Sequence, residues 1–96
     1  MAKITVVAKL TVKAGAVAAV KSELLKMIAP TRAEEGCIEY RLHQDNDDPA
    51  VFTFYENWQN MTSLQQHMNS AHFNSYVAAV GDRLAEKAVN IMTEIS

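Results

Sequence analysis

The segment Cys37–Trp58, CIEYRLHQDNDDPAVFTFYENW, decides the fold of this chain. Polar and apolar residues alternate over Cys37–Gln44 and again over Val51–Trp58, and a period of two residues predicts two half-buried β-strands. The residues between them, Asp45–Pro49, have the composition and the length of a hairpin turn. We therefore expect a central antiparallel hairpin. One face of its second strand carries Phe52, Phe54, Glu56 and Trp58.

The residues before the hairpin predict one strand and one helix. Lys3–Lys13 alternates β-branched with polar residues, which is typical of a half-buried strand. In Ala16–Ala29 the apolar positions recur every three or four residues, which predicts a helix with one buried stripe. Pro30 follows, and a proline cannot continue the interior of a helix without a kink. Thr31–Glu35 would then add a last turn before Gly36.

The residues after the hairpin predict a broken helix and a last strand. Met61–Met68 has helical spacing, and Asn69-Ser70 interrupts it because these side chains compete for backbone hydrogen bonds. A second helical piece is expected from Phe73 to Leu84, and a fourth strand over Ala88–Ile95. The order β-α-β-β-α-β with one central hairpin is that of the ferredoxin-like split βαβ sandwich, an α+β fold with an antiparallel sheet.

Composition excludes several classes of protein. The 96 residues suffice for a single domain, 1–96, with one core. The net charge is −2 and no segment concentrates Lys or Arg, so no nucleic-acid partner is expected. The longest apolar runs are about five residues against the roughly 20 of a membrane span, so no membrane partner is expected either. Cys37 is the single cysteine, which favours a reducing, cytoplasmic location.

Two further features concern cofactors and assembly. Glycine occurs at only three positions, so there is no glycine-rich phosphate loop, and no Cys/His group has metal-binding spacing. Any catalysis is therefore expected to use side chains, water and substrate, with no cofactor and no metal. The sheet face without helices carries apolar residues such as Val7 and Val51. Because an uncovered apolar face on a small domain favours an oligomer contact, we expect a homodimer joined through this face.

Three segments together resemble one protein family. They are Glu35-Gly36-Cys37-Ile38-Glu39-Tyr40, Phe52-x-Phe54-x-Glu56-x-Trp58 and His67-x-x-x-x-His72-Phe73. Over nearly its whole length the chain is similar to the antibiotic-biosynthesis monooxygenase family of dimeric ferredoxin-like proteins. The resemblance implies a homodimer of α+β barrels, with a small cavity in each subunit between helices and sheet. It also implies oxygenation of quinols or polyketide phenols without metal or flavin, whereas other relatives isomerise a phosphorylated signalling sugar.

One branch of this family degrades haem, and its functional residues are replaced here. That branch has an Asn in the first strand, a Trp in the second helical region and a ligating His further along. This chain has Ala8, His67 and Val77 at those positions. The resemblance therefore argues against haem degradation.

His67 and His72 are the candidate catalytic residues, because imidazole titrates near neutrality and can act as a base or as a proton donor. On a continuous helix two residues five apart would lie about 140° apart, so these two could not ligate one metal ion together. A break at Asn69-Ser70 would allow both to border one cavity. The competing interpretation is that each makes ordinary surface hydrogen bonds at a helix end.

Four aromatic residues are candidates for substrate binding. Trp58 could stack on a flat ligand and offer its indole N–H, or it could simply fill the core at the end of the barrel. Tyr76 lies one helical turn after His72 and could hold a phenolate together with it, or leave its hydroxyl in water. Phe73 and Phe54 would form apolar walls.

Glu56 and Cys37 each have a functional and a structural interpretation. A desolvated Glu56 would be a base with a raised pKa. The alternative, which we favour, makes it a structural partner for a backbone amide, Arg41 or Arg83. Cys37 could be a nucleophile, but no sequence feature indicates a lowered pKa, so we expect a small buried residue at a strand start.

The function most consistent with these residues is that of a cofactor-independent monooxygenase, with a small aromatic or quinol-like substrate and O2 as its partners. His67 or His72 would take a phenolic proton from a ring held against Trp58. Two alternatives stay open. An isomerase of a small, phosphorylated carbonyl compound would need a cation in the cavity, and the sequence places no arginine there. A non-catalytic ligand-binding dimer would need neither histidine.

Overall fold

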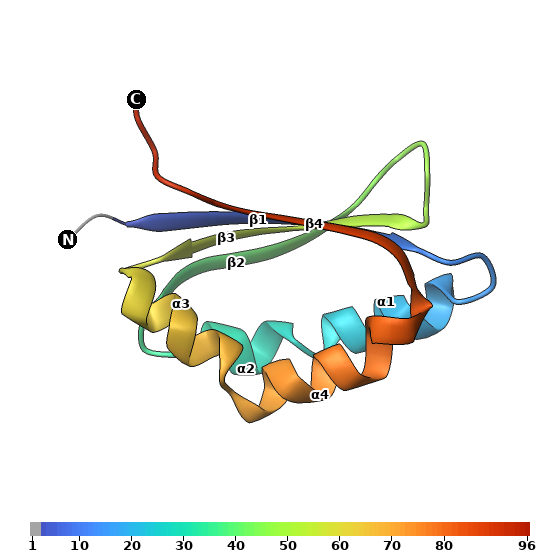
Figure 1. Cartoon of the computed structure of the whole chain (residues 1–96), viewed down its shortest axis with the longest axis horizontal. Helices are drawn as coiled ribbons and strands as arrows, with labels where there is room; N and C mark the ends of the chain where they lie inside the picture. Colours follow the sequence, from blue (N-terminus) through green and yellow to red (C-terminus); the bar gives the residue numbers. More distant parts are fainter. Residues whose placement is uncertain (1–2) are drawn as a thin grey trace.

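The computed structural model describes residues 3–96, which form a four-stranded antiparallel sheet with helices on one face only (Figure 1). In chain order the elements are β1 (Ile4–Val12), α1 (Val17–Leu25), α2 (Ile28–Arg32), β2 (Cys37–Gln44), β3 (Val51–Trp58), α3 (Met61–Met68), α4 (Ala71–Val80), the 3-10 turn η1 (Gly81–Arg83) and β4 (Leu84–Met92). The strand order is β2-β3-β1-β4. This arrangement confirms the ferredoxin-like α+β fold.

The predicted hairpin supplies an edge strand, β2, and a central strand, β3, and it sets which side chains enter the core. β2 and β3 begin and end where the alternation predicted, and Leu42 lies opposite Phe54. β3 also pairs with β1, where Ala8 lies opposite Phe54 on its other side. Residues opposite one another across a ladder point to the same face of a sheet. The buried face toward the helices therefore carries Val6, Ala8, Leu10, Val12, Tyr40, Phe52, Phe54, Glu56 and Trp58.

The helix predicted over Ala16–Ala29 is divided in two. α1 already ends at Leu25, and α2 runs from Ile28 through Pro30 to Arg32. The expected discontinuity is present, but it precedes Pro30, because α2 begins two residues before the proline. Pro30 lies in the first turn of α2, where a backbone N–H has no partner within the helix and its absence costs nothing.

The last strand begins earlier than predicted. Leu84 was assigned to a helix and the strand to Ala88–Ile95, whereas β4 runs from Leu84 to Met92. Its length follows β1, with which it pairs from Val12 opposite Leu84 to Thr5 opposite Met92. Ile95 lies beyond the end of this ladder and is 96% exposed. The partner strand, rather than the local alternation, determines where β4 begins and ends.

The predicted break between α3 and α4 is present and has a clear cause. Ser70 is the N-cap of α4, and its hydroxyl oxygen accepts a hydrogen bond from the Phe73 N–H at 3.2 Å. The same hydroxyl donates to the His67 carbonyl, the last turn of α3, at 2.7 Å. One side chain thus closes one helix and opens the next. None of the helices within residues 3–96 is long and apolar enough to cross a bilayer.

Candidate active site

The turn between α2 and β2 approaches α3 closely because it contains a glycine. A Cβ at Gly36 would collide with the side chain of Ser63. The Gly36 carbonyl accepts a hydrogen bond from the Gln59 N–H at 2.9 Å, just before α3 begins. This contact brings Glu34, two residues earlier in the turn, beside His67 of α3.

Glu34 joins the two candidate histidines. Its Oε2 accepts a hydrogen bond from Nδ1 of His67 at 2.6 Å and another from Nε2 of His72 at 2.8 Å. The helix break makes this possible, because on one straight helix the two rings would point about 140° apart. The His67 side chain is 2% exposed, whereas that of His72 is 25% exposed. Only the first histidine is therefore an interior group.

The environment of His67 determines its protonation. Burial lowers the pKa of His67 below its usual range, and the hydrogen bond and charge of Glu34 oppose this only in part. The ring is therefore neutral at pH 7. Because a carboxylate can only accept, the proton of the neutral ring lies on Nδ1 and leaves Nε2 as an acceptor. The ring lies 4.6 Å from the Trp58 ring, centroid to centroid.

A cavity of about 300 Å³ lies between the sheet and helices α3 and α4, and His67 lines it. Most of its wall is apolar, and three polar side chains reach it from different elements. Such a surface, with few and converging polar groups, is typical of a small-molecule site. The aromatic residues of the wall are Tyr40, Phe54, Phe73 and Tyr76, and the charged or titratable ones are Glu56, His67 and Lys87.

Glu56 is buried in this wall, and it has no cationic partner among residues 3–96. It is 6% exposed, and within the described residues its hydrogen-bond partner is Trp58, whose Nε1–H donates to Oε1 at 2.9 Å. Arg41 pairs with Glu39 on the opposite face of the sheet. Burial raises the pKa of Glu56 to about 7, the Trp58 N–H opposes this, and Glu34 adds to it. The expected arginine partner was therefore wrong, and Glu56 titrates near neutrality.

The structure brings together four of the six predicted site residues. His67, Phe54, Phe73 and Tyr76 line the cavity, whereas Trp58 and His72 are not in its wall. Trp58 is fully buried beneath the His67 ring, so a ligand cannot stack on it as predicted. Its role is to hold Glu56 by a hydrogen bond.

Other groups at the site were missed by sequence reasoning. Glu34, Tyr40 and Lys87 come from a turn, the second strand and the last strand, and no local pattern links them. Burial raises the pKa of Tyr76 to about 12, and that of Tyr40 still higher, so both phenols stay protonated donors at pH 7.

Cys37 is only half-buried, and no reactive thiol is formed there. Burial and the nearby carboxylates of Glu34 and Glu56 raise the pKa of Cys37 to about 11. A nucleophilic cysteine needs a lowered pKa, so the structural interpretation of this residue is the better one.

The three-residue cluster could also receive a divalent cation. Glu34, His67 and His72 each offer one ligand atom, and these atoms lie within 4.8 Å of one another. Sequence spacing had indicated no such group, because the carboxylate is more than thirty residues away along the chain. In the structure one oxygen of Glu34, Oε2, accepts a hydrogen bond from each histidine.

Fold and site together define a small ferredoxin-like protein with an aromatic cavity that contains two buried acid–base groups. A comparison with family models matches residues 3–79 to the family described as "Antibiotic biosynthesis monooxygenase". The chain belongs to this family.

Individual relatives agree with this assignment. The Mycobacterium tuberculosis protein named "Putative monooxygenase Rv0793" is 32% identical over 93 residues, 96% of this chain and 91% of that protein. Its solved structure has a TM-score of 0.93, over 98% and 96% of the two chains. PA3566 from Pseudomonas aeruginosa has a TM-score of 0.95 at 30% identity, over 100% and 97%. The uncharacterised Synechocystis protein sll1783 is 36% identical over 61 residues, which are 64% of this chain but 42% of that protein.

Proposed function

We propose that the protein is a cofactor-independent monooxygenase that oxidises a small quinol or polyphenol with O2. The observation that carries this proposal is the pairing of His67 and Glu56 in one aromatic cavity. Their environments act in opposite directions, because burial lowers the pKa of the first and raises that of the second to about 7. A cavity with one neutral base and one carboxyl group that is partly protonated at pH 7 suits proton abstraction followed by proton return.

His67 acts as the base in this proposal. Its Nδ1–H is held by Glu34, so its Nε2 is free to accept the phenolic proton of a ring bound against Phe54 and Phe73. The protonated hydroxyl of Tyr76 is a donor that stabilises the resulting phenolate. Glu34 is thus a positioning residue that fixes which nitrogen of His67 faces the substrate.

The substrate supplies the electrons. A carbon of the phenolate ring bonds to O2 and forms a peroxide, and Glu56 in its protonated form gives the distal oxygen its proton. The ring carbon then loses its hydrogen as a proton to the ionised Glu56, which restores that carboxyl group, and the O–O bond breaks. One oxygen atom remains as a quinone carbonyl, and the other takes the phenolic proton back from His67 and leaves as water. In the net reaction the C–H carbon becomes a carbonyl carbon and O2 is reduced by four electrons.

The proposal includes a homodimer in the cytoplasm. The sheet face without helices presents Tyr55 and Met92, which are 38% and 43% exposed, in addition to the predicted Val7 and Val51. These apolar side chains support the packing of a second copy against this face. The single cysteine, Cys37, is a free thiol, which fits a reducing compartment.

One observation favours the isomerase as a second candidate. That reaction needs a cation beside the cavity. The sequence placed no arginine there, but Lys87 lines the cavity in the structure. The two candidates differ in their need for oxygen, because an isomerase turns over its substrate under argon.

The test is oxygen uptake with hydroquinone and with simple polyphenols, followed by mass spectrometry of the product after reaction under ¹⁸O₂. We expect one labelled atom in the quinone, and turnover that survives treatment with EDTA. His67→Gln should lower the rate by about 10²–10⁴-fold, because it removes the positioned base. His43→Gln, on the helix-free face of the sheet, is the matched control and should leave the rate unchanged. Equal rates in the two variants would refute the assignment of the base.

A further inference from the structure

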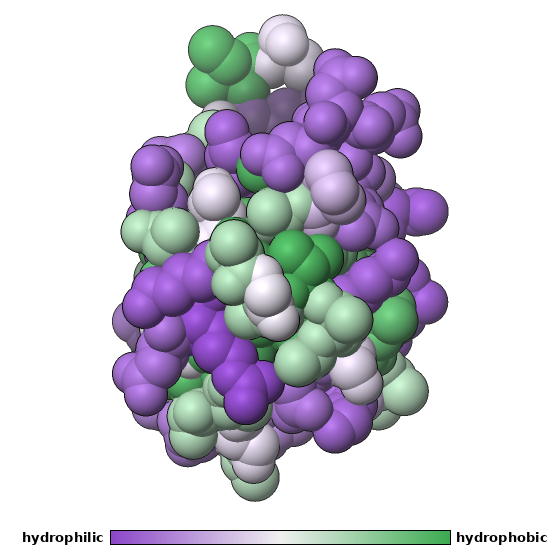
Figure 2. Space-filling view, turned by 90° about the vertical axis from the view of Figure 1, so that its right-hand side faces the viewer, coloured by the Kyte–Doolittle hydropathy of each residue, from purple (hydrophilic) through white to green (hydrophobic). Residues whose placement is uncertain are grey.

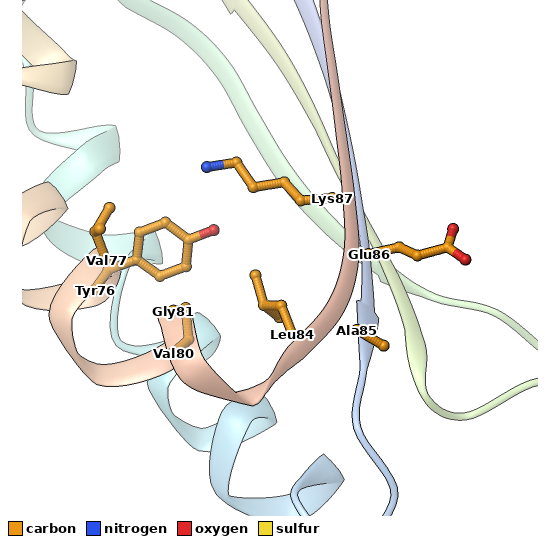
Figure 3. A pocket seen from close by; sticks show the side chains of 8 residues that line it. All are labelled: Tyr76, Val77, Val80, Gly81, Leu84, Ala85, Glu86 and Lys87. Atoms are coloured by element: carbon orange, nitrogen blue, oxygen red, sulfur yellow. The ribbon is translucent and has the colours of Figure 1, made fainter.

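The helix-facing side of β4 presents one charged side chain to the cavity. Lys87 lies opposite the fully buried Leu10 of β1, so it points to the same side of the sheet as the core. Figure 3 shows its side chain extending from β4 toward the side of the strand on which the ring of Tyr76 lies. Glu86, the next residue along the chain, points away to the other side of the strand.

Lys87 has no ion-pair partner among residues 3–96. The salt bridges within this range join other groups, and the neighbouring carboxylate of Glu86 faces Thr11 on the opposite face of the sheet. Lys87 is exposed to solvent, and its side chain lines the cavity while its charge has no carboxylate partner within this range.

Two hollows meet at this lysine. The cavity of about 300 Å³ that contains Glu56 and His67 is lined on its outer side by Tyr76 and Lys87. A second hollow of about 270 Å³, between the end of α4 and the start of β4, is lined by the same two residues together with Val77, Val80 and Leu84. Figure 2 shows the end of the molecule where α4 passes into β4. Apolar residues gather at the centre of this view, and hydrophilic residues surround them. A ring bound in the inner cavity would therefore direct an outward substituent toward the Lys87 amino group.

We propose that Lys87 recognises an anionic substituent of the substrate, so that the substrate class is a phenolic ring that carries a carboxylate. This inference rests on the proposed function for the ring chemistry, but the recognition itself is a matter of binding. The ammonium group is a point charge with three donors on a flexible stem. Because Lys87 is exposed, water and salt screen its attraction for an anion, which is therefore limited to the scale of one charge-assisted hydrogen bond.

The test compares two ligands that differ in one group. Hydroquinone is neutral and 2,5-dihydroxybenzoate is the same ring with a carboxylate. Calorimetric titration under argon measures binding without turnover. We expect the wild type to bind the acid about tenfold more tightly than hydroquinone, the scale of one charge-assisted hydrogen bond. The preference should shrink as salt is raised, because the site is open to solvent.

Three variants locate the preference. Lys87→Met keeps the apolar stem and should reduce the preference to twofold or less, whereas Lys87→Arg should retain most of it. Lys13→Met is the matched control, because Lys13 is an exposed lysine that follows β1 and lines neither hollow, and it should behave as wild type. Circular dichroism melts verify that each variant is folded.

The outcomes separate this inference from the proposed function. A preference that disappears in Lys87→Met, without oxygen uptake, supports the anion site and refutes the monooxygenase. Oxygen uptake with hydroquinone, without any preference for binding the acid, supports the monooxygenase and refutes the anion site. Equal affinities in the wild type, no binding of the acid at millimolar concentration, or a preference that survives in Lys87→Met would each overturn the role of Lys87.

Discussion

Replacing Glu56 by glutamine should stabilise the protein at alkaline pH while it impairs turnover. The two side chains have nearly the same shape, and the amide oxygen of Gln can still accept the hydrogen bond that Trp58 donates at 2.9 Å. The change therefore removes the ability to ionise and leaves packing in place. It tests whether this carboxyl group is kept at a cost in stability.

The size of the effect follows from the shift in pKa. Burial raises the pKa of Glu56 from 4.5 to about 7, so the folded protein holds this proton more tightly than the unfolded chain does. The stability that the protein keeps by burying Glu56 in its protonated form is fully present below pH 4.5. It is lost as the pH rises through 7. Each pH unit is worth about 1.4 kcal/mol, so ionised Glu56 destabilises the wild type by about 3 kcal/mol above pH 7. Glutamine does not ionise and avoids this loss.

The assay is urea unfolding of the wild type and of Glu56→Gln at pH 5, 7 and 8.5. The stability of the variant relative to wild type should increase across this range and reach about 3 kcal/mol at most. Glu86→Gln, an exposed carboxylate on the helix-free face, is the control and should show no such increase. In parallel, quinol oxidation should fall by about 10²–10⁴-fold in Glu56→Gln. A difference in stability that is the same at all three pH values would refute the reasoning.

Three further predictions concern the positioning of the site and the assembly. His72→Ala should lower turnover by less than about tenfold, because His72 is outside the cavity and the 2.6 Å hydrogen bond from His67 to Glu34 remains. A loss of turnover as large as that in His67→Gln would make His72 the base. Gly36→Ala should destabilise the protein by about 1–3 kcal/mol in urea unfolding, because its Cβ collides with Ser63. Adding Ser63→Gly should recover part of that loss despite the roughly 1 kcal/mol cost of glycine in a helix, and no recovery would exclude the collision as the cause. Sedimentation at micromolar concentration should show a dimer that Tyr55→Glu dissociates; a wild-type species of only 10.6 kDa would contradict this.

The sequence by itself determined the elements whose pattern is local. Alternation fixed the bounds of β2 and β3, and the pair Asn69-Ser70 predicted the break that separates His67 from His72. It also identified four of the residues in the cavity wall, because helix and strand periods place residues on a common face. These features depend on neighbours within a few residues, which the sequence displays directly.

Only the tertiary structure decided the rest, because the determining contacts come from distant parts of the chain. β4 starts at Leu84 because β1 offers a ladder there, and this earlier start puts Lys87 in phase with Val89 on the cavity side. Glu34 meets the histidines because Gly36 lets a turn approach α3. The pKa of Glu56 depends on how completely the fold removes water from it. Trp58 is covered by the ring of His67, which belongs to another element. Desolvation and long-range register are properties of the assembled fold, and no local spacing encodes them.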